Sequence, residues 1–249
     1  MKIILSPAKQ MHVNTDIVDS IDDPVFLEKS SEILTWLKGK SKDELKSLWK
    51  CNDKILEQNF ERLETMDLYR RLTPAILAYD GIAYKYMAPA VFEDGHFDYV
   101  QEHLRILSAF YGSLKAMDGV TPYRLEMQAK ANIDGTKNLY EYWGDLIYKE
   151  VRDESGIIIN LASKEYSKCI EKYLTADDHY ISITFCEMSK GKLVTKGTYA
   201  KMARGEMVRY MAENNIEDPQ EIKGFNRLGY VFREELSSET EYVFERINL

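Results

Sequence analysis

Short runs of aliphatic residues predict the strands of a buried sheet. Residues 2–5 (KIIL) are the first such run, and residues 75–79 (AILAY) are the second. Residues 156–161 (GIIINL) contain three consecutive isoleucines, which indicates burial on both faces and a position at the centre of the sheet. Two further strands are predicted near the end of the chain, at 230–233 and 242–247.

Apolar residues at helical spacing predict the helices between these strands. In residues 97–111 the apolar side chains from Val100 to Tyr111 share one face, so we expect a buried amphipathic helix that ends at Gly112. Other helices are predicted from Pro24 to Gly39, at 139–151, and from an N-cap at Thr198 to Asn214.

A helical hairpin is predicted in residues 41–63. Ser41 and Glu44 have the spacing of a capping box at the start of its first helix. Residues 51–54 are expected to break that helix, and apolar residues from Ile55 to Leu63 predict the second. A β-hairpin is also predicted, from residues 180–186 and 192–196. The whole pattern favours an α/β (mixed α+β) fold with a central mixed sheet flanked by helices, in a single domain spanning 1–249.

Composition narrows the class of protein. The chain has 249 residues and is 45% hydrophobic, which is ordinary for one globular domain. It contains no run of about 18 apolar residues, and its start is too short in apolar residues for a signal peptide, so we expect a cytoplasmic protein without a membrane partner. Cys51, Cys169 and Cys186 are odd in number and far apart, which predicts reduced thiols and neither a disulfide framework nor a zinc site.

The formal net charge of −8 argues against a protein that binds nucleic acid through its overall field. Any phosphate partner therefore needs a local basic patch. Acidic residues cluster at 19–23 and 234–241, where they are interpreted as solvated surface.

Polar residues follow two of the predicted strands at the point where each strand ends. Ser6 and Lys9 follow the first strand, and Ser163 and Glu165 follow the strand that ends near Asn160. Ligands of open α/β sheets bind beyond the carboxyl ends of parallel strands, so the two junctions are expected to share one crevice. The alternative for Lys9 is an exposed loop lysine.

Two more segments carry candidate binding groups. Pro122 stiffens the connection that holds Tyr123, Arg124 and Glu126. Lys201 and Arg204 lie three residues apart near a helix start, where their positive charge opposes the macrodipole. An anion between them would explain this cost, although two surface cations are also tolerated.

The resulting hypothesis is an anion-binding cleft with an open question about catalysis. The predicted anion-binding residues are Ser6, Lys9, Arg124, Ser163, Lys201 and Arg204. Glu126 and Tyr123 are candidates to move a proton, and the alternative for Glu126 is a structural ion pair with Arg124.

Common cofactor motifs are missing from the sequence. It has no Gly-x-Gly-x-x-Gly, Walker or Gly-x-Ser-x-Gly motif, and His96 and His103 lack the residues of a zinc helix. We therefore expect no cofactor and no metal.

Several longer motifs resemble one known family. IILSPAK, LRILSAFYGSLKAMDGVTPYRLEM, NLYEYWGD, INLASKEY, KMARGEM and GFNRLGYVF occur in the order seen in the YaaA family of peroxide stress resistance proteins. The resemblance implies a cytoplasmic bacterial protein of unusual α/β architecture that lowers free intracellular iron, limits oxidative DNA damage and binds DNA. The family's basic cleft would map onto Lys9, Arg124, Lys201 and Arg204, and its helix-hairpin-helix-like element onto 41–63. The hairpin departs from that pattern, because its turn lacks glycine and its second helix is acidic.

Two functions follow from these observations. The first is a stress-response protein that binds double-stranded DNA by its phosphates without reading sequence. The alternative is an enzyme acting on a nucleotide or another phosphorylated small molecule in the same cleft. Direct iron sequestration is disfavoured, because the sequence shows no cluster of metal ligands.

Overall fold

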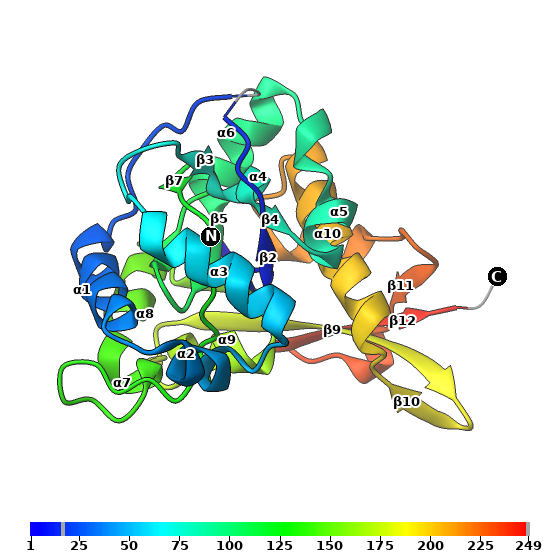
Figure 1. Ribbon diagram of the computed structural model, residues 1–249. Helices are drawn as coiled ribbons and strands as arrows, with labels where there is room; N and C mark the ends of the chain where they lie inside the picture. The colour runs from blue at the N-terminus through cyan, green and yellow to red at the C-terminus, as the bar shows by residue number, and fades with distance from the viewer. Residues whose placement is uncertain (16–17, 248–249) are drawn as a thin grey trace.

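A central mixed sheet organises the molecule (Figure 1). The computed structural model describes residues 1–15 and 18–247. The strand order along the sheet is β11-β12-β9-β8-β1-β5-β6, and β10 pairs with the outer end of β9. The strands are β1 (Lys2–Leu5), β5 (Leu104–Ser108), β6 (Gly112–Leu114), β8 (Ile157–Asn160), β9 (His179–Ser189), β10 (Lys192–Val194), β11 (Tyr230–Phe232) and β12 (Glu241–Arg246). Two small ladders lie outside it: β2 (Gln10–Met11) with β4 (Tyr79–Asp80), and β3 (Thr73–Pro74) with β7 (Gly119–Val120).

The middle of the sheet is parallel. β12, β9, β8, β1 and β5 all run in one direction, while β6, β10 and β11 are antiparallel to their neighbours. β8 lies at the centre with Ile158 and Ile159 fully buried, as the isoleucine run predicts. After β1 the chain reaches β5 on one side, and it later returns to β8 on the other side of β1. The sheet therefore has a topological switch point between β1 and β8.

Helices pack around this sheet. They are α1 (Leu27–Lys38), α2 (Lys42–Trp49), α3 (Asp53–Thr65), α4 (Ala75–Ala78), α5 (Ile82–Met87), α6 (Asp94–His103), α7 (Leu139–Trp143), α8 (Leu146–Val151), α9 (Lys164–Glu171) and α10 (Gly197–Glu213), with 3₁₀ turns at Pro89–Val91, Pro219–Gly224 and Glu234–Leu236. The predicted fold class is confirmed. In residues 1–15 and 18–247, no helix is long and apolar enough to cross a membrane.

The helical hairpin is confirmed as α2 followed by α3. Ser41 and Glu44 form the predicted capping box, and Asn52 caps α3 by accepting the Ile55 N–H. Ion pairs join the two helices, because Lys42 contacts Glu57 and Lys46 contacts Asp53. Two lysines of this hairpin are thus already engaged by its own acidic residues.

The predicted helix over 97–111 is wrong in its second half. α6 ends at His103, and Leu104–Ser108 is the buried strand β5. The apolar run that suits one helix face also suits a strand, and parallel pairing with β1 decides between them. Gly112 does not end a helix; it opens β6 with a φ of +76°.

Three smaller predictions also differ from the structure. Residues 75–79 form the single turn of α4 and only the first residue of β4, because their backbone bonds to the loop carbonyls of Ala116 and Asp118 and not to a long strand. The helix predicted at 139–151 is interrupted at Gly144, whose φ is +52°. α10 begins at Gly197 after Lys196, so Thr198 is not its N-cap.

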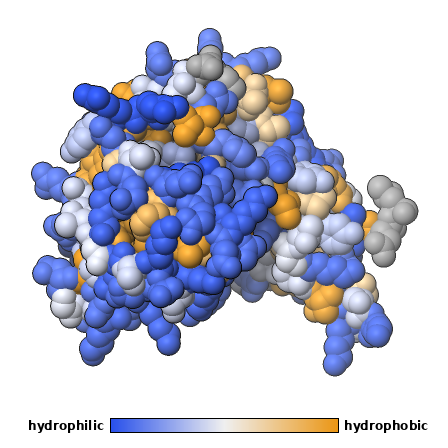
Figure 2. Space-filling view, in the orientation of Figure 1, coloured by the Kyte–Doolittle hydropathy of each residue, from blue (hydrophilic) through white to orange (hydrophobic). Residues whose placement is uncertain are grey.

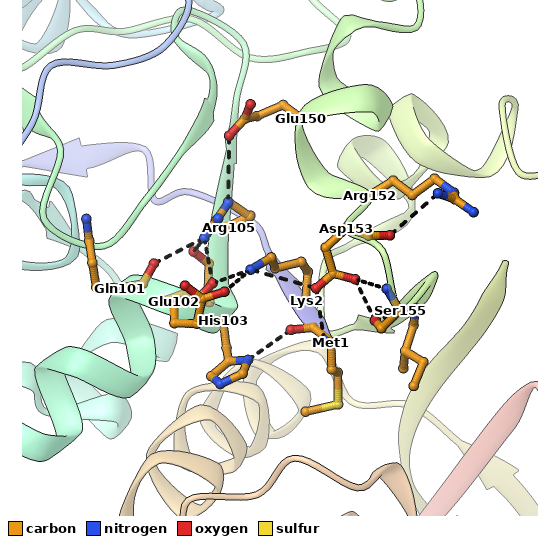
Figure 3. A network of polar contacts seen from close by, with 12 residues as sticks. Met1, Lys2, Gln101, Glu102, His103, Arg105, Glu150, Arg152, Asp153 and Ser155 are labelled. Atoms are coloured by element: carbon orange, nitrogen blue, oxygen red, sulfur yellow. Dashed lines mark hydrogen bonds and ion pairs between the residues drawn. The ribbon is translucent and has the colours of Figure 1, made fainter.

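The amino ends of the central strands carry a network of paired charges (Figure 3). Arg105 Nη1 donates to the carbonyl oxygens of Gln101 and Glu102 in the last turn of α6, and Lys2 Nζ also donates to Glu102. These carbonyls have no partner within their helix, so the cations satisfy them and complement the helix dipole. Carboxylates complete the network: Glu102 and Asp153 pair with Lys2, and Glu150 lies 4.0 Å from Arg105 Nε.

Candidate functional site

A cavity of about 460 Å³ opens at the carboxyl ends of β1 and β8, at the switch point of the sheet. Ligands of open α/β proteins bind at this position. The structure brings every candidate residue to its wall: Ser6, Lys9, Tyr123, Arg124, Glu126, Ser163, Lys201 and Arg204. The predicted shared crevice therefore exists, and whether it binds an anion stays a prediction.

Two serines join the strand ends. Ser6 Oγ donates to Ser163 Oγ at 3.1 Å and accepts the Ser163 N–H at 2.8 Å. Tyr84 of α5 donates its hydroxyl to the Ser6 carbonyl oxygen at 3.0 Å. These bonds explain why the two junctions meet. Because Ser6 Oγ donates its proton to Ser163 Oγ, the hydroxyl proton of Ser163 is not used in this contact.

Residues 122–127 form one wall of the cavity, as expected from the stiff segment after Pro122. Lys9 Nζ lies 2.8 Å from Glu126 Oε2, and Arg124 Nη2 lies 3.7 Å from Glu126 Oε1. Arg124 Nη2 also donates weakly to the Trp49 carbonyl oxygen at 3.5 Å, while its buried Nε has no partner among residues 1–15 and 18–247. Glu126 thus offsets much of the positive charge on this wall.

Tyr123 belongs to a buried hydroxyl chain. Its oxygen lies 2.9 Å from Tyr79 Oη and 2.7 Å from Ser108 Oγ. Burial raises the pKa of Tyr123 to about 12, although the bonds from Ser108 and Tyr79 lower it. A phenol held in this way stays protonated at neutral pH, so its position suits alignment of the wall better than proton transfer.

Helix α10 forms another wall, and among the described residues its cations Lys201 and Arg204 have no counter-charges. Among residues 1–15 and 18–247, Arg204 has no hydrogen bond or ion pair, and its Nε is buried without a partner. Burial lowers the pKa of the Arg204 guanidinium below its ordinary value. Lys201, one turn earlier, is exposed and is also unpaired within the described chain. A desolvated, unpaired guanidinium is costly unless an anion joins it.

A close helix crossing places Arg204 at this wall. α5 and α10 lie side by side (Figure 1), and a Cβ built on Gly205 would lie only 1.8 Å from the Ala83 carbonyl oxygen. Only glycine permits this approach of two backbones. The neighbouring Arg204 is thereby held against the cavity that α5 and β1 also line.

Sequence reasoning missed several residues of the site. Tyr84, Tyr166 and the pair Asp80–Gly81 all line the cavity. Asp80 contacts Lys85 at 3.2 Å and His12 at 2.9 Å, so Lys85 is also neutralised. The Asp-Gly step after AILAY was the available signal, since Gly81 lies against Ala8, whose Cβ would be 2.7 Å from an added Cβ.

A second cavity of about 700 Å³ is lined by residues of β8, α9 and β9. Arg204 lines both cavities. Asn160 lines the second one and accepts the Ala162 N–H at 2.8 Å, while Glu165 lines the first and bonds to Gln128. Arg204 therefore contributes to the walls of both cavities.

The two histidines of α6 contact backbone groups. His96 accepts the Glu93 N–H in a capping box, and His103 contacts the Met1 carbonyl oxygen. Within the part of the chain that the structure describes, no group of three or more His, Cys, Asp or Glu side chains could hold a metal ion.

These features define an α/β protein with a recessed cationic cavity at the switch point of a mixed sheet. A family model described as peroxide stress protein YaaA matches residues 1–236, so the chain belongs to that family, and the resemblance is confirmed. The family is one of stress-response proteins.

Its relatives are similar along nearly their whole length. A UPF0246 protein of Agathobacter rectalis is 71% identical over 246 residues, which are 99% of each chain. Similar UPF0246 proteins occur in Desulfitobacterium hafniense, at 56% identity over 98% of this chain and 97% of that one, and in Lachnoclostridium phytofermentans, at 53% over 98% and 96%.

Proposed function

We propose that this peroxide stress protein binds double-stranded DNA through its phosphates, without reading sequence, at the groove between α10 and residues 122–127. The observation that carries the proposal is the unpaired Arg204 at the wall shared by both cavities. Guanidinium groups bind phosphate oxygens through several N–H donors, and Lys201 adds a second positive charge on the exposed rim.

The proposed setting is the cytoplasm. Bound protein would shield DNA from oxidative damage during peroxide stress. The family resemblance also implies that the protein lowers free intracellular iron, and this stays a prediction. Spectroscopic measurement of free iron in cells with and without the protein would check it.

The test is a gel-shift titration of duplex DNA with wild-type protein and with Arg204→Met, at salt concentrations between about 50 and 200 mM. We expect wild-type affinity to fall steeply with salt, and the variant to bind more weakly with a shallower salt dependence. The double variant Lys130→Ala, Lys137→Ala is the control, because both lysines are exposed and their ammonium groups have no partner in the described chain. Unchanged DNA affinity in Arg204→Met would overturn the proposal.

Thermal unfolding adds a second, independent readout. Removing an arginine that only supports the fold lowers the free energy of unfolding. Removing a buried charge that has no partner raises it, because that charge is costly to bury. We therefore expect Arg204→Met to raise the melting temperature by about 2–4 °C, which corresponds to about 1 kcal/mol. A lower melting temperature would show that Arg204 supports the fold and not a ligand.

A second candidate is an enzyme acting on a nucleotide or another phosphorylated small molecule. The recessed cavity of about 460 Å³, lined by Tyr84, Tyr123 and Tyr166, favours it, because such rings pack against flat ligands. Glu126 would move the proton in that case. A closed small-molecule site would show little salt dependence, so calorimetry with nucleoside phosphates at low and high salt separates the two candidates.

A further inference from the structure

The longest stretch of the chain without an acidic residue leads into the cavity. Residues 188–205 contain no Asp or Glu, although the whole protein has a net charge of −8. The stretch carries Lys190, Lys192, Lys196, Lys201 and Arg204. Positive charge is therefore concentrated in one continuous segment, which consists of the β9–β10 turn, β10 and the first half of α10.

The β9–β10 hairpin projects from the body of the molecule. Figure 1 shows it extending beyond α10, and Figure 2 shows hydrophilic side chains gathered at its end. Every residue from Lys190 to Thr198 is exposed. In the antiparallel register Leu193 lies opposite Met188, and Lys192 lies opposite Ser189. One face of the ribbon is therefore apolar at this level, while the other face presents Lys192.

Most cations of this segment are available to a partner. Lys196 pairs with Glu187 at the base of the hairpin. Within residues 1–15 and 18–247, the ammonium groups of Lys190 and Lys192 have no ion-pair or hydrogen-bond partner, and the same holds for Lys201 and Arg204. The hairpin end and the cavity wall thus carry uncompensated charge of the same sign.

We propose that the hairpin is a basic arm that lies along the phosphate backbone of duplex DNA and extends the contact begun at the α10 cavity. The inference rests on the proposed function and adds a second contact surface to it. A two-stranded ribbon has dimensions that fit the major groove, where flanking lysines reach the phosphates. Pairing of β10 with β10 of a second copy is the competing arrangement, and it would bring like charges of Lys192 together.

The arm variant Lys190→Ala, Lys192→Ala tests the inference. Duplexes of two unrelated sequences are titrated with wild type, the arm variant, Arg204→Met and the Lys130→Ala, Lys137→Ala control. The arm variant and the control lose the same charge, so a general electrostatic effect would weaken both equally. We expect the arm variant to lose about tenfold in DNA affinity, equally for both sequences, while the control keeps the wild-type affinity. The slope of log affinity against log salt concentration should be smaller by about 2 in the arm variant. Since the substituted lysines are exposed, the melting temperature should not change.

The outcomes separate this inference from the proposed function. If Arg204→Met weakens DNA binding while the arm variant matches the control, the cavity stands as a DNA site and the arm inference fails. If the arm variant weakens binding and Arg204→Met does not, the arm stands and the cavity fails. If wild type binds no duplex DNA, both fail. Sedimentation of free protein checks the competing arrangement, and an arm-dependent dimer would overturn the inference.

Discussion

Buried cations have different partners at the two ends of the central parallel strands. At the amino ends, Lys2 and Arg105 are buried, and each contacts carbonyl oxygens of α6 together with a carboxylate. At the carboxyl ends, Arg204 is partly buried without any partner in the described chain, and Arg124 shares one carboxylate with Lys9. The first arrangement supports the fold, and the second leaves a cation without a partner among the described residues, on which the proposed function rests.

This difference in partners, and not the residue type, is the basis for the proposal that Arg204 binds a ligand. Arginine occurs at both ends, and burial lowers the pKa of both Arg105 and Arg204. Only the partners differ, because Glu150 and Glu102 raise the pKa of Arg105 whereas burial acts alone on Arg204. A buried charge left unpaired costs folding free energy, so we expect it to be retained for a ligand.

The largest expected effect on stability comes from removing Arg105 from the charge network at the amino ends of the strands. Arg105→Met leaves the carbonyl oxygens of Gln101 and Glu102 with fewer donors and leaves Glu150 unpaired. We expect a loss of about 3–5 kcal/mol in the free energy of unfolding, measured by chemical denaturation. The same substitution at Arg204 should have the opposite sign. Equal effects at the two arginines would remove the distinction between the two ends.

Gly205→Ala tests whether the close crossing of α5 and α10 holds Arg204 in place at the cavity. The added methyl group would meet the Ala83 carbonyl oxygen, so α5 and α10 must separate. We expect a loss of about 1–3 kcal/mol, together with weaker DNA binding because Arg204 moves with α10. Gly197→Ala is the matched control in the same helix, since no atom of the described residues lies within 4 Å of its Cβ position. Equal stability of the two variants would contradict the crossing.

Asp118, which lies near Arg105, is a carboxyl group whose pKa is raised and not lowered, so it should make the stability of the fold depend on pH. Burial raises the pKa of this carboxyl group to about 7, while Lys115 and Arg105 lower it only in part. The folded state therefore holds its proton more tightly than the unfolded chain does. Stability should fall as pH rises from about 4 to about 7 and then level off.

Asp118→Asn should remove this pH dependence, since an amide oxygen can still accept the Lys115 N–H bond. Chemical denaturation at several pH values measures the change. Asp153 has the opposite shift, because bonds from Ser155 and the Met1 ammonium outweigh burial and lower its pKa to about 2. Its contribution should therefore disappear only below about pH 4. A wild-type profile without a decline between pH 4 and 7 would contradict the prediction for Asp118.

The smallest expected effect concerns Glu126. If it only offsets Lys9 and Arg124, then Glu126→Gln frees both cations and should raise DNA affinity about two- to fivefold. Glu154→Gln at the opposite end of the sheet is the control, because it removes an exposed charge far from the cavity. In the enzymatic alternative, the same change would abolish turnover, so an affinity measurement and an activity measurement give different answers.

Local signals in the sequence were sufficient for part of the fold and most of the candidate site. The capping box at Ser41, the buried run at Ile158 and Ile159, and the β9–β10 hairpin depend on near neighbours in the chain. Ser6, Lys9 and Ser163 were predicted from one general rule, that polar groups after parallel strands meet at one edge. This rule placed Ser6 and Ser163 together, and the structure shows them bonded. Arg124 was predicted from the stiff segment after Pro122, and Lys201 and Arg204 from their charge near a helix start.

Other features depended on contacts between distant segments. Leu104–Ser108 has the spacing of a helix face, yet its pairing with β1 makes it a strand. Tyr84 and Gly81 reach the cavity only because α5 packs against α10 and the β1 junction.

The sequence by itself determined that cations occur after a strand (Lys9), in the stiff segment after Pro122 (Arg124) and near the start of a helix (Lys201 and Arg204), because residue type and the ends of elements depend on near neighbours in the chain. Only the tertiary structure decided which of them are neutralised. Glu126 engages Lys9 and Arg124, while nothing in the described chain engages Arg204. Electrostatic compensation depends on distances of a few ångströms between segments far apart in the chain, and the spacing of residues along a sequence does not contain those distances.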